Sequence, residues 1–166
     1  MLIVIPAHNE EATIQDVVSD LKMHGYNDIL IVDDASTDLT ASLAKQLNVK
    51  VMSLPYNVGA WKATQAGVRY AKKYGYSHLV TFDADKQHLA SQIQALIDCQ
   101  NNLSANLVIG SCPSRGSISR RIAWSVFRTL SSVKVQDLTS GFRLYDRKAI
   151  EALSKKQFRI FNAKNI

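Results

Sequence analysis

The stretch Leu2–Asp34, LIVIPAHNEEATIQDVVSDLKMHGYNDILIVDD, decides the fold of this chain. Its two apolar runs, Leu2–Pro6 and Ile29–Val32, have the length and composition of buried strands. Between them apolar residues recur at helical spacing, at Ile14, Val17, Val18 and Leu21. A strand, a helix and a second strand in this order form a βαβ unit, which predicts a parallel sheet.

Local signals predict where the helix of this unit begins and ends. Asn9 is the expected N-cap, and Glu10 and Glu11 would complement the helix dipole in the first turn. Gly25 is expected to end the helix, because glycine readily adopts the left-handed conformation that follows a last turn.

The alternation of strand and helix continues as far as Gly110. Further strands are predicted at Val49–Leu54, His78–Phe82 and Leu107–Ile109. Further helices are predicted from Thr37 or Asp38 to about Leu47, from Gly59 to about Tyr74, and near Ser91–Cys99. This pattern predicts an α/β fold whose parallel sheet is covered by helices on both faces.

Charge divides the chain unevenly. Residues 1–110 carry 8 Lys and Arg against 11 Asp and Glu, a net charge of −3, whereas residues 111–166 carry 12 against 3, a net charge of +9. The basic part is suited to anions such as nucleic acid, phosphate-bearing substrates or an anionic membrane surface. A solvated basic face without a partner is the alternative reading of the same charges.

The basic part contains one predicted amphipathic helix, Ile118–Val135. Its apolar stripe consists of Ile118, Ile122, Val126, Leu130 and Val133, and its Arg and Lys residues lie mostly off that stripe. Such a helix either docks on the core of its own domain or rests on anionic lipid headgroups. Both alternatives stay open.

The 166 residues suffice for one domain. No apolar run approaches the roughly 20 residues of a membrane span, and Met1–Ile5 lacks the layout of a signal peptide. Cys99 and Cys112 show neither metal-ligand nor CxxC spacing, which favours a reducing, cytoplasmic environment.

Polar clusters follow three of the predicted strands, at Pro6–Glu10, Asp33–Ser36 and Asp83–His88. In an open α/β sheet, ligands bind at the carboxyl ends of the strands. Several carboxylates at one edge repel each other unless a cation joins them, and Mg²⁺ takes one or two carboxylates together with substrate phosphates. The clusters therefore predict a site for a divalent metal and a nucleoside diphosphate.

The segment Asp83-Ala84-Asp85-Lys86-Gln87 contributes the metal ligands in this prediction. In an extended or turning segment alternate residues point the same way, so the oxygens of Asp83, Asp85 and Gln87 can reach one ion. Two acids around a small residue also occur in ordinary turns. The position of this segment directly after a buried strand, with two polar strand ends upstream, favours the metal site.

These motifs, in this order, resemble the family 2 glycosyltransferases, above all the branch of polyprenyl-phosphate (dolichyl-phosphate) mannose and glucose synthases. The matching pieces are Ile3–Glu10, Ile31–Asp38, Asn57–Gly59 with Ala63 and Gly67, Phe82–His88 and Asp137–Tyr145. The resemblance implies a GT-A fold, a Rossmann-like three-layer αβα sandwich around a mostly parallel sheet. It also implies inverting transfer of a sugar from a UDP- or GDP-sugar, assisted by Mg²⁺ or Mn²⁺.

Residue roles follow from the resemblance. Pro6, Ala7, Glu10 and Asp34 would line the base and ribose, and the remaining nucleotide-sugar contacts would come from Gly59, Lys62, Asp83 and Ala84. Asp83, Asp85 and Gln87 would hold the metal, with Asp85 counted as catalytic. Arg143 would bind a phosphate of donor or acceptor through its bidentate fork. Asp137 is a weaker candidate for a base or an orienting group near the acceptor.

The resemblance also implies a single catalytic domain with two halves. Residues 1–110 would bind the nucleotide sugar, and residues 111–166 would form the acceptor side. Family members usually continue further, so this side is expected to be incomplete and the fold C-terminally short. The expected acceptor is a polyprenyl phosphate at the cytoplasmic face of an anionic membrane. Because such a phosphate is already ionised it needs no general base, whereas a sugar hydroxyl would.

Departures from the family and rival functions limit this interpretation. Lys86 stands where the family usually has glycine, so its ammonium group could contact a phosphate or take over part of the metal's role. Ala90 replaces a usual proline, and Arg115 is an uncertain equivalent of a family arginine.

Two alternative functions remain. One is a catalytically weak sugar-nucleotide-binding module, and the other is a transferase acting on a saccharide in cell-envelope polysaccharide synthesis. A phosphoacceptor receiver domain, a dinucleotide-binding domain and a nucleic-acid-binding protein are disfavoured, the last two because their motifs are absent.

Overall fold

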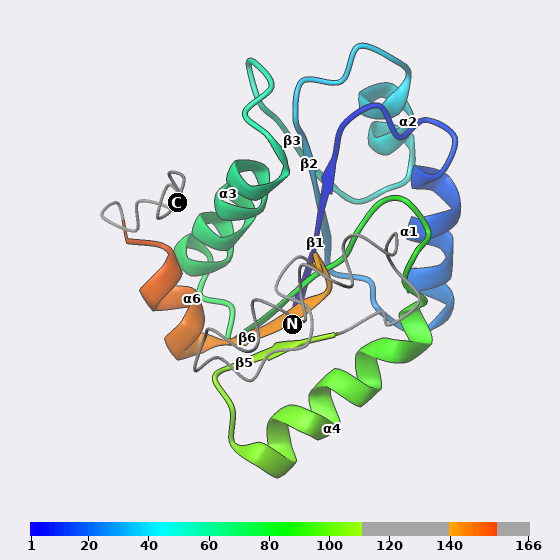
Figure 1. The fold of residues 1–166 in the computed structure, drawn as a ribbon. Coiled ribbons are helices and arrows are strands. Elements are labelled where there is room, and N and C mark those ends of the chain that lie inside the picture. The colour runs from blue at the N-terminus through cyan, green and yellow to red at the C-terminus, as the bar shows by residue number, and fades with distance from the viewer. Residues whose placement is uncertain (111–139, 156–166) are drawn as a thin grey trace, which may run out of the picture.

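A computed structural model describes residues 1–110 and 140–155, which form a six-stranded sheet in the order β3-β2-β1-β4-β6-β5 (Figure 1). The strands are β1 (Leu2–Ala7), β2 (Ile29–Asp33), β3 (Lys50–Ser53), β4 (His78–Thr81), β5 (Leu107–Ile109) and β6 (Arg143–Asp146). β1 pairs in parallel with β2 and β4, and β2 pairs in parallel with β3. β6 lies between β4 and β5 and runs antiparallel to both, so the sheet is mostly parallel.

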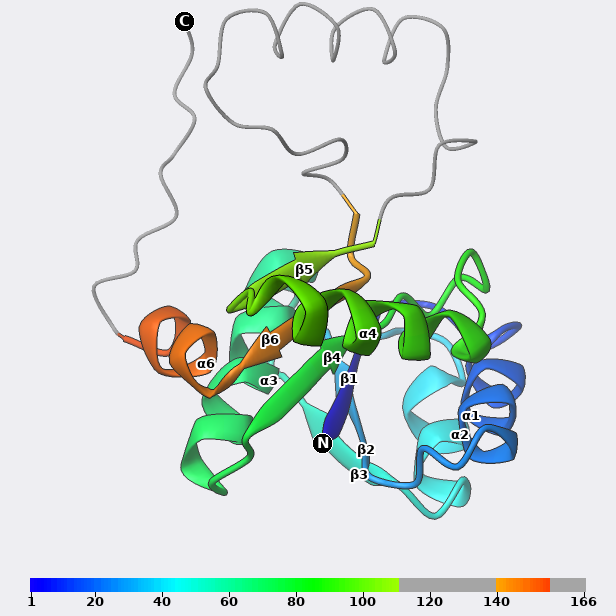
Figure 2. The ribbon, with the colours of Figure 1, turned by 90° about the horizontal axis from the view of Figure 1, so that it is seen from below.

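Helices cover both faces of the sheet (Figures 1 and 2). They are α1 (Ile14–Met23), α2 (Thr40–Gln46), α3 (Ala60–Lys73), the 3₁₀ turn η1 (Ala90–Gln92), α4 (Ile93–Leu103) and α6 (Arg147–Leu153). Alternate residues of β1 face opposite sides: Ile3 and Ile5 pack in the core with α1, α2 and α4, whereas Leu2 and Val4 pack in a second core with α3 and α6. The expected three-layer αβα sandwich is therefore confirmed.

The predicted N-cap of the first helix is wrong. α1 begins at Ile14, and Asn9 instead has a φ of 57° in the loop after β1. Its side-chain oxygen accepts the N–H of Thr37 at 2.9 Å, and its own N–H donates to Ser36 Oγ at 3.0 Å. Asn9 thus joins the loops that follow β1 and β2. The local sequence gives no sign of these contacts, because Ser36 and Thr37 lie 27 and 28 positions away.

Other boundaries differ less. α2 begins at Thr40 rather than at residue 37 or 38, because the Asp38 carboxylate accepts the Thr40 N–H at 2.9 Å and so precedes the helix. α4 continues to Leu103, past the predicted end. The predicted β5 is confirmed, whereas β6 and α6 were not predicted.

The predicted helix at Ile118–Val135 lies outside the described residues. Within the two described ranges, no helix has the length and apolarity to cross a bilayer.

Close approach between α3 and β1 explains one glycine. A Cβ at Gly67 would lie 2.3 Å from Cγ1 of Val4, which is itself fully buried in β1. The absence of a side chain at Gly67 therefore lets the helix axis lie close to the sheet. This contact sets the position of α3, before which Gly59 donates its N–H to Asp34 at the end of β2.

A polar cluster ties the opposite edge of the sheet, before β2, β3 and β4. Lys50 pairs with Asp28, and the Tyr76 hydroxyl donates to Asp28 Oδ1 at 3.0 Å. Burial alone would raise the pKa of Asp28. The hydrogen bonds from Lys50 and Tyr76, together with the lysine charge, outweigh burial and bring that pKa below its ordinary value.

We predict that Asp28→Asn lowers the free energy of unfolding at pH 7. A carboxylate whose folded-state pKa is depressed adds stability above its unfolded pKa, about 3.9, and loses it as pH falls through the folded value. Because both partners of the ion pair are more than one third exposed, the loss should stay below about 1 kcal/mol. Urea unfolding of both proteins at pH 7 and in steps to pH 3 measures it. A difference that grows as pH falls would contradict the assignment.

Candidate functional site

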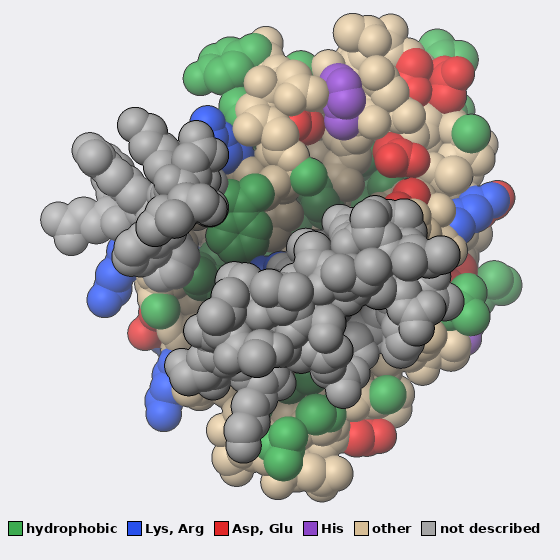
Figure 3. All heavy atoms as spheres, in the orientation of Figure 1, with side chains coloured by type: hydrophobic (Ala, Val, Ile, Leu, Met, Phe, Trp, Pro, Cys, Tyr) green, Lys and Arg blue, Asp and Glu red, His purple; other side chains and the backbone are tan. Residues whose placement is uncertain are grey.

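A pocket of about 320 Å³ lies where the strand ends converge. Its lining residues are Pro6, Ala7, His8, Glu10, Asp34, Asn57, Gly59, Ala60, Asp83, Ala84 and Asp85. They come from the ends of β1, β2 and β4 and from the beginning of α3. Acidic side chains and a histidine gather on the upper part of the face in Figure 3. The strand-end rule from which the site was predicted therefore describes where the pocket is.

Asp34 organises one wall of this pocket. Its side chain is buried, at 2% exposure, and its two carboxylate oxygens accept the N–H groups of Val58 and Gly59, each at 2.8 Å. Gly59 has a φ of 87°, a left-handed conformation that glycine adopts without strain. Asp34 therefore fixes the loop before α3 against the end of β2. Its backbone is fixed too, because its own N–H donates to the Ala7 carbonyl at 2.8 Å.

The loops after β1 and β2 hold each other by reciprocal bonds. Glu11 accepts the Leu39 N–H at 2.9 Å, and its own N–H donates to Asp38 at 3.2 Å. The Glu10 N–H donates to the Thr40 hydroxyl at 2.7 Å. Burial alone raises the pKa of Asp38, but the hydrogen bonds from Thr40 and Glu11 bring it below its ordinary value. Asp38 is therefore an ionised acceptor between the two loops.

His8 has a structural partner as well as a place in the pocket lining. Its Nδ1 lies 2.9 Å from the Asp34 carbonyl oxygen, which can only accept, so Nδ1 carries the hydrogen in this contact. This bond adds to the link between the two loops. The imidazole is thereby held at the edge of the pocket.

Asp83 lies where β6 comes alongside β4. The His88 ring, only 4% exposed, places its Nε2 3.6 Å from Asp83 Oδ2 and stacks on Phe142 at 4.7 Å between centroids. A Cβ at Gly141 would lie 1.9 Å from Asp83 Oδ1. The Asp83 carboxylate can therefore lie against the Ser140-Gly141-Phe142 segment because residue 141 has no side chain.

Asp85 lies in a turn two residues further on. Its Oδ1 accepts the Gln87 N–H at 3.1 Å, and Lys86 between them has a φ of 61°. A non-glycine residue in the left-handed region costs about 1–2 kcal/mol, which accounts physically for the glycine that the related family usually has here. The Lys86 ammonium forms an ion pair with Asp16 of α1. A contact between Lys86 and a phosphate stays a prediction.

The residues present fit a divalent cation that is bound together with a diphosphate. Asp83 and Asp85 both border the pocket and supply the carboxylate oxygens that Mg²⁺ and Mn²⁺ bind. Within residues 1–110 and 140–155, no group of three or more His, Cys, Asp or Glu is placed to hold a metal unaided. Two carboxylates suit Mg²⁺, which typically uses one or two and completes its shell with phosphates and water.

Arg143 begins β6 and lies beside α3. Its Nε–H donates to the Ser140 carbonyl at 2.8 Å, and its Cζ lies 5.7 Å from the centre of the Trp61 ring. This distance is typical of a cation–π contact, which orients the guanidinium group. Arg143 therefore links the segment that contacts Asp83 to the first turn of α3.

Most of the predicted residues lie in one place. Eight of them line the pocket: Pro6, Ala7, Glu10, Asp34, Gly59, Asp83, Ala84 and Asp85. Lys62 and Gln87 do not line it, although each lies two residues beyond a residue that does. Arg143 does not line it either, and Asp137 lies outside the described residues. His8, Asn57 and Ala60 also line the pocket. No binding role was predicted for them, although Asn57 belongs to a motif that matches the family.

Comparisons with known proteins agree with this arrangement. The family model described as glycosyl transferase family 2 matches residues 2–154. A dolichyl-phosphate N-acetylglucosaminyltransferase that uses UDP-N-acetylglucosamine, from Methanococcus voltae, is 32% identical, over 93% of this chain and 72% of its own. A polyprenol monophosphomannose synthase from Mycolicibacterium smegmatis is 31% identical, over 92% and 63%. An undecaprenyl-phosphate mannosyltransferase from Micrococcus luteus is also 31% identical, over 92% and 69%.

A solved structure supports the fold. Glucosyl-3-phosphoglycerate synthase from Mycobacterium tuberculosis, in complex with Mn²⁺, UDP-glucose and phosphoglyceric acid, superposes with a TM-score of 0.72 at 22% identity. The match covers 89% of this chain and 56% of that one, so the chain spans little more than half of the solved protein. The expected GT-A fold is thus confirmed. From its fold, its pocket and its relatives, this chain belongs to glycosyl transferase family 2.

Proposed function

We propose that the chain transfers a sugar, with inversion, from a UDP- or GDP-sugar to a polyprenyl phosphate in a metal-dependent reaction. The observation that carries the proposal is the convergence of Asp34, Asp83 and Asp85 on one pocket at the strand ends. The relatives from Methanococcus, Mycolicibacterium and Micrococcus are all named for polyprenyl-type phosphate acceptors. The structural neighbour with bound UDP-glucose and Mn²⁺ supports the choice of donor class and metal.

The donor would lie across the ends of β1 and β2. Pro6 and Ala7 offer backbone and apolar surface to a base, and Glu10 and Asp34 offer carboxylate oxygens to ribose hydroxyls. Asp34 already holds two backbone N–H groups, so its orientation is set before the ligand arrives. The beginning of α3, with Gly59 and Lys62, carries the positive end of a helix dipole, which suits the diphosphate.

Asp83 and Asp85 would hold the Mg²⁺ or Mn²⁺ ion, with Gln87 as a further oxygen ligand. When bound, the ion neutralises the charge that grows on the leaving diphosphate. His88 lies beside the Asp83 carboxylate, and the missing side chain at Gly141 leaves room for it. Arg143, oriented by Trp61 and Ser140, would bind a phosphate of the donor or acceptor.

A polyprenyl-phosphate acceptor sets the place of the reaction and its need for a base. The phosphate is ionised at neutral pH and can attack the sugar directly, so Asp137 would orient the acceptor rather than remove a proton. Such a lipid keeps the reaction at a membrane surface. The proposal therefore includes association with the cytoplasmic face of the membrane, to which the basic residues 111–166 would contribute electrostatically.

We predict that UDP or GDP binds in the presence of Mn²⁺ and that Asp85→Ala weakens this binding at least tenfold, because the variant loses a metal ligand. Isothermal titration calorimetry of both nucleotides, with and without Mn²⁺, measures the effect and identifies the base. Asp98→Ala, which removes an exposed carboxylate from α4, is the matched control and should bind like the wild type. Failure of folded wild-type protein to bind either nucleotide would contradict the proposed donor site.

We predict that Gly141→Ala weakens the same metal-dependent binding about tenfold or more, because the new methyl group would displace the Asp83 carboxylate. Gly75→Ala is the control, since Gly75 follows the far end of α3, a Cβ there would meet nothing within 4 Å, and only its φ of 73° opposes a side chain. It should cost about 1–2 kcal/mol of stability and leave nucleotide affinity near the wild-type value. Equal losses of affinity in the two variants would contradict the claim that Gly141 positions the Asp83 carboxylate.

The acceptor is tested by transfer. We predict that the protein moves sugar from its donor to undecaprenyl or dolichyl phosphate in detergent micelles, with product detected by mass spectrometry. A polyprenol without phosphate should accept no sugar, because its hydroxyl group is not ionised. Transfer to a saccharide instead would favour the polysaccharide alternative, and nucleotide affinity without turnover to any acceptor would leave a binding module.

A further inference from the structure

The segment that carries the three proposed metal ligands has no regular helix or strand. Residues 82–89 connect β4 to η1. Both ends of the segment are anchored in the core, because Phe82 and Ala90 are buried and Phe82 donates its N–H to the Val4 carbonyl at 2.9 Å. Between these anchors Ala84 and His88 are also buried, whereas Asp85 is partly exposed and Lys86 and Gln87 are exposed. The backbone at Lys86 and Gln87 is therefore the part of the segment most sensitive to individual side-chain contacts.

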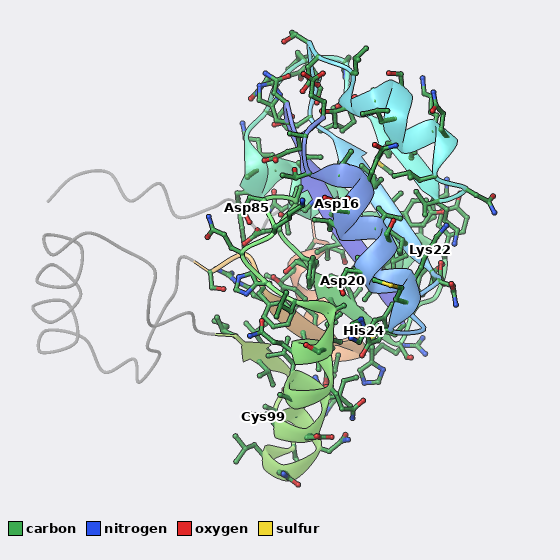
Figure 4. The ribbon with its side chains drawn as sticks, turned by 90° about the vertical axis from the view of Figure 1, so that its right-hand side faces the viewer. Asp16, Asp20, Lys22, His24, Asp85 and Cys99 are labelled. Carbon is green, nitrogen blue, oxygen red and sulfur yellow. The ribbon has the colours of Figure 1, made fainter. Side chains whose placement is uncertain are left out.

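Two of these contacts lead to α1. Asp16 forms an ion pair with the Lys86 ammonium group, and Asp20 Oδ2 accepts the Ala90 N–H at 2.9 Å. Asp16 and Asp20 are four residues apart, so they lie on the same side of the helix. Figure 4 shows them following each other down α1, beside the segment that carries Asp85. The residues that they hold, Lys86 and Ala90, lie on either side of Gln87.

α1 is itself held firmly. Its apolar side, Ile14, Val17, Val18 and Leu21, is buried in the core. Asp20 also has a fixed environment, because His24 Nδ1 lies 2.9 Å from its carbonyl oxygen and 3.2 Å from Oδ1. A chain of contacts therefore runs from the sheet core through α1 to the turn with Asp85 and Gln87.

The contact with Lys86 matters because of the backbone at this residue. Lys86 has a φ of 61°, a conformation that a lysine rarely adopts without support. The turn brings the Gln87 N–H to Asp85 Oδ1 at 3.1 Å, so Lys86 in this conformation contributes to the orientation of the Asp85 carboxylate. An ion pair from Lys86 to a rigid helix favours the turn over more extended alternatives.

We propose that Asp16 and Asp20 are positioning residues for the metal-binding turn, with Lys86 as the link between α1 and Asp85. The inference rests on the proposed function, since it assigns a role to residues that touch neither metal nor nucleotide. In a protein with glycine at position 86 the turn would need no such link. Here the ion pair between Lys86 and Asp16 supports a backbone conformation that glycine would adopt unaided.

Substitutions at Lys86 separate positioning from electrostatics. Lys86→Met removes the ion pair and keeps a side chain at positive φ, so Mn²⁺ affinity should fall about threefold, the size expected of an exposed ion pair. Simple charge repulsion predicts the opposite, because the variant removes a cation near the metal. Lys86→Gly should recover affinity relative to Lys86→Met, since glycine adopts the turn unaided. Asp16→Ala should weaken binding in the wild type and have little effect when combined with Lys86→Gly.

Substitutions at Asp20 test the second contact. Asp20→Ala removes the acceptor of the Ala90 N–H, and we expect about tenfold weaker Mn²⁺ binding, at the lower end of losses seen for groups that orient metal ligands. Asp20→Asn removes the same charge but keeps an oxygen acceptor for the Ala90 N–H, so its Mn²⁺ affinity should fall much less. Hydrogen exchange of the Ala90 amide should be faster in Asp20→Ala than in Asp20→Asn.

The measurement is the electron paramagnetic resonance signal of free Mn²⁺, titrated with each folded variant and the nucleotide that the wild type binds. Asp98→Ala provides the control for loss of a distant carboxylate. If the wild type binds Mn²⁺ and nucleotide but Lys86→Met and Asp20→Ala bind equally well, the positioning role is overturned and the proposed function stands. If Lys86→Met binds Mn²⁺ more tightly, electrostatics rather than positioning describes Lys86. If the wild type binds neither ligand, both proposals fail.

Discussion

The pocket depends above all on the buried Asp34 carboxylate, which accepts the N–H groups of Val58 and Gly59 at the end of β2. This side chain joins the second strand to the loop before α3, and its backbone is joined to β1 through Ala7. A buried charge is tolerable only where hydrogen bonds replace its hydration, and here two charge-assisted bonds do so. The same bonds set the distance between two walls of the proposed nucleotide site.

The side of the pocket with Asp83 and Asp85 is held by other contacts. The Asp83 carboxylate lies against Gly141, just before the antiparallel strand β6, and the turn with Asp85 is joined to α1 by the ion pair between Lys86 and Asp16. Both carboxylates therefore owe their positions to elements distant in sequence. A diphosphate with its metal would lie between a wall fixed by backbone hydrogen bonds and a turn fixed by side chains. The turn is the part of the site whose geometry single substitutions should change most easily.

Strand positions and strand-end clusters were predictable because they depend on short apolar runs and on the rule that parallel strands end at one edge. The roles of Asn9 and Asp38 were harder to predict, since Asn9 bonds to the loop after β2 and Asp38 accepts from Glu11 in the loop after β1 as well as from Thr40 of its own helix. The partner of Lys86, Asp16, is 70 residues away and left no local signal. The antiparallel direction of β6 was equally hidden, because the sequence of Arg143–Asp146 does not specify which strand it pairs with.

The central claim is that one metal ion and one nucleoside diphosphate share the pocket at the strand ends. A crystal structure with Mn²⁺ and the preferred nucleotide, using anomalous diffraction from the manganese, tests it most directly. We expect an anomalous peak bound by carboxylate oxygens of Asp83 or Asp85 and by the diphosphate, with the base and ribose between Pro6 and Asp34. A nucleotide bound elsewhere, or a manganese peak remote from both carboxylates, would contradict the claim.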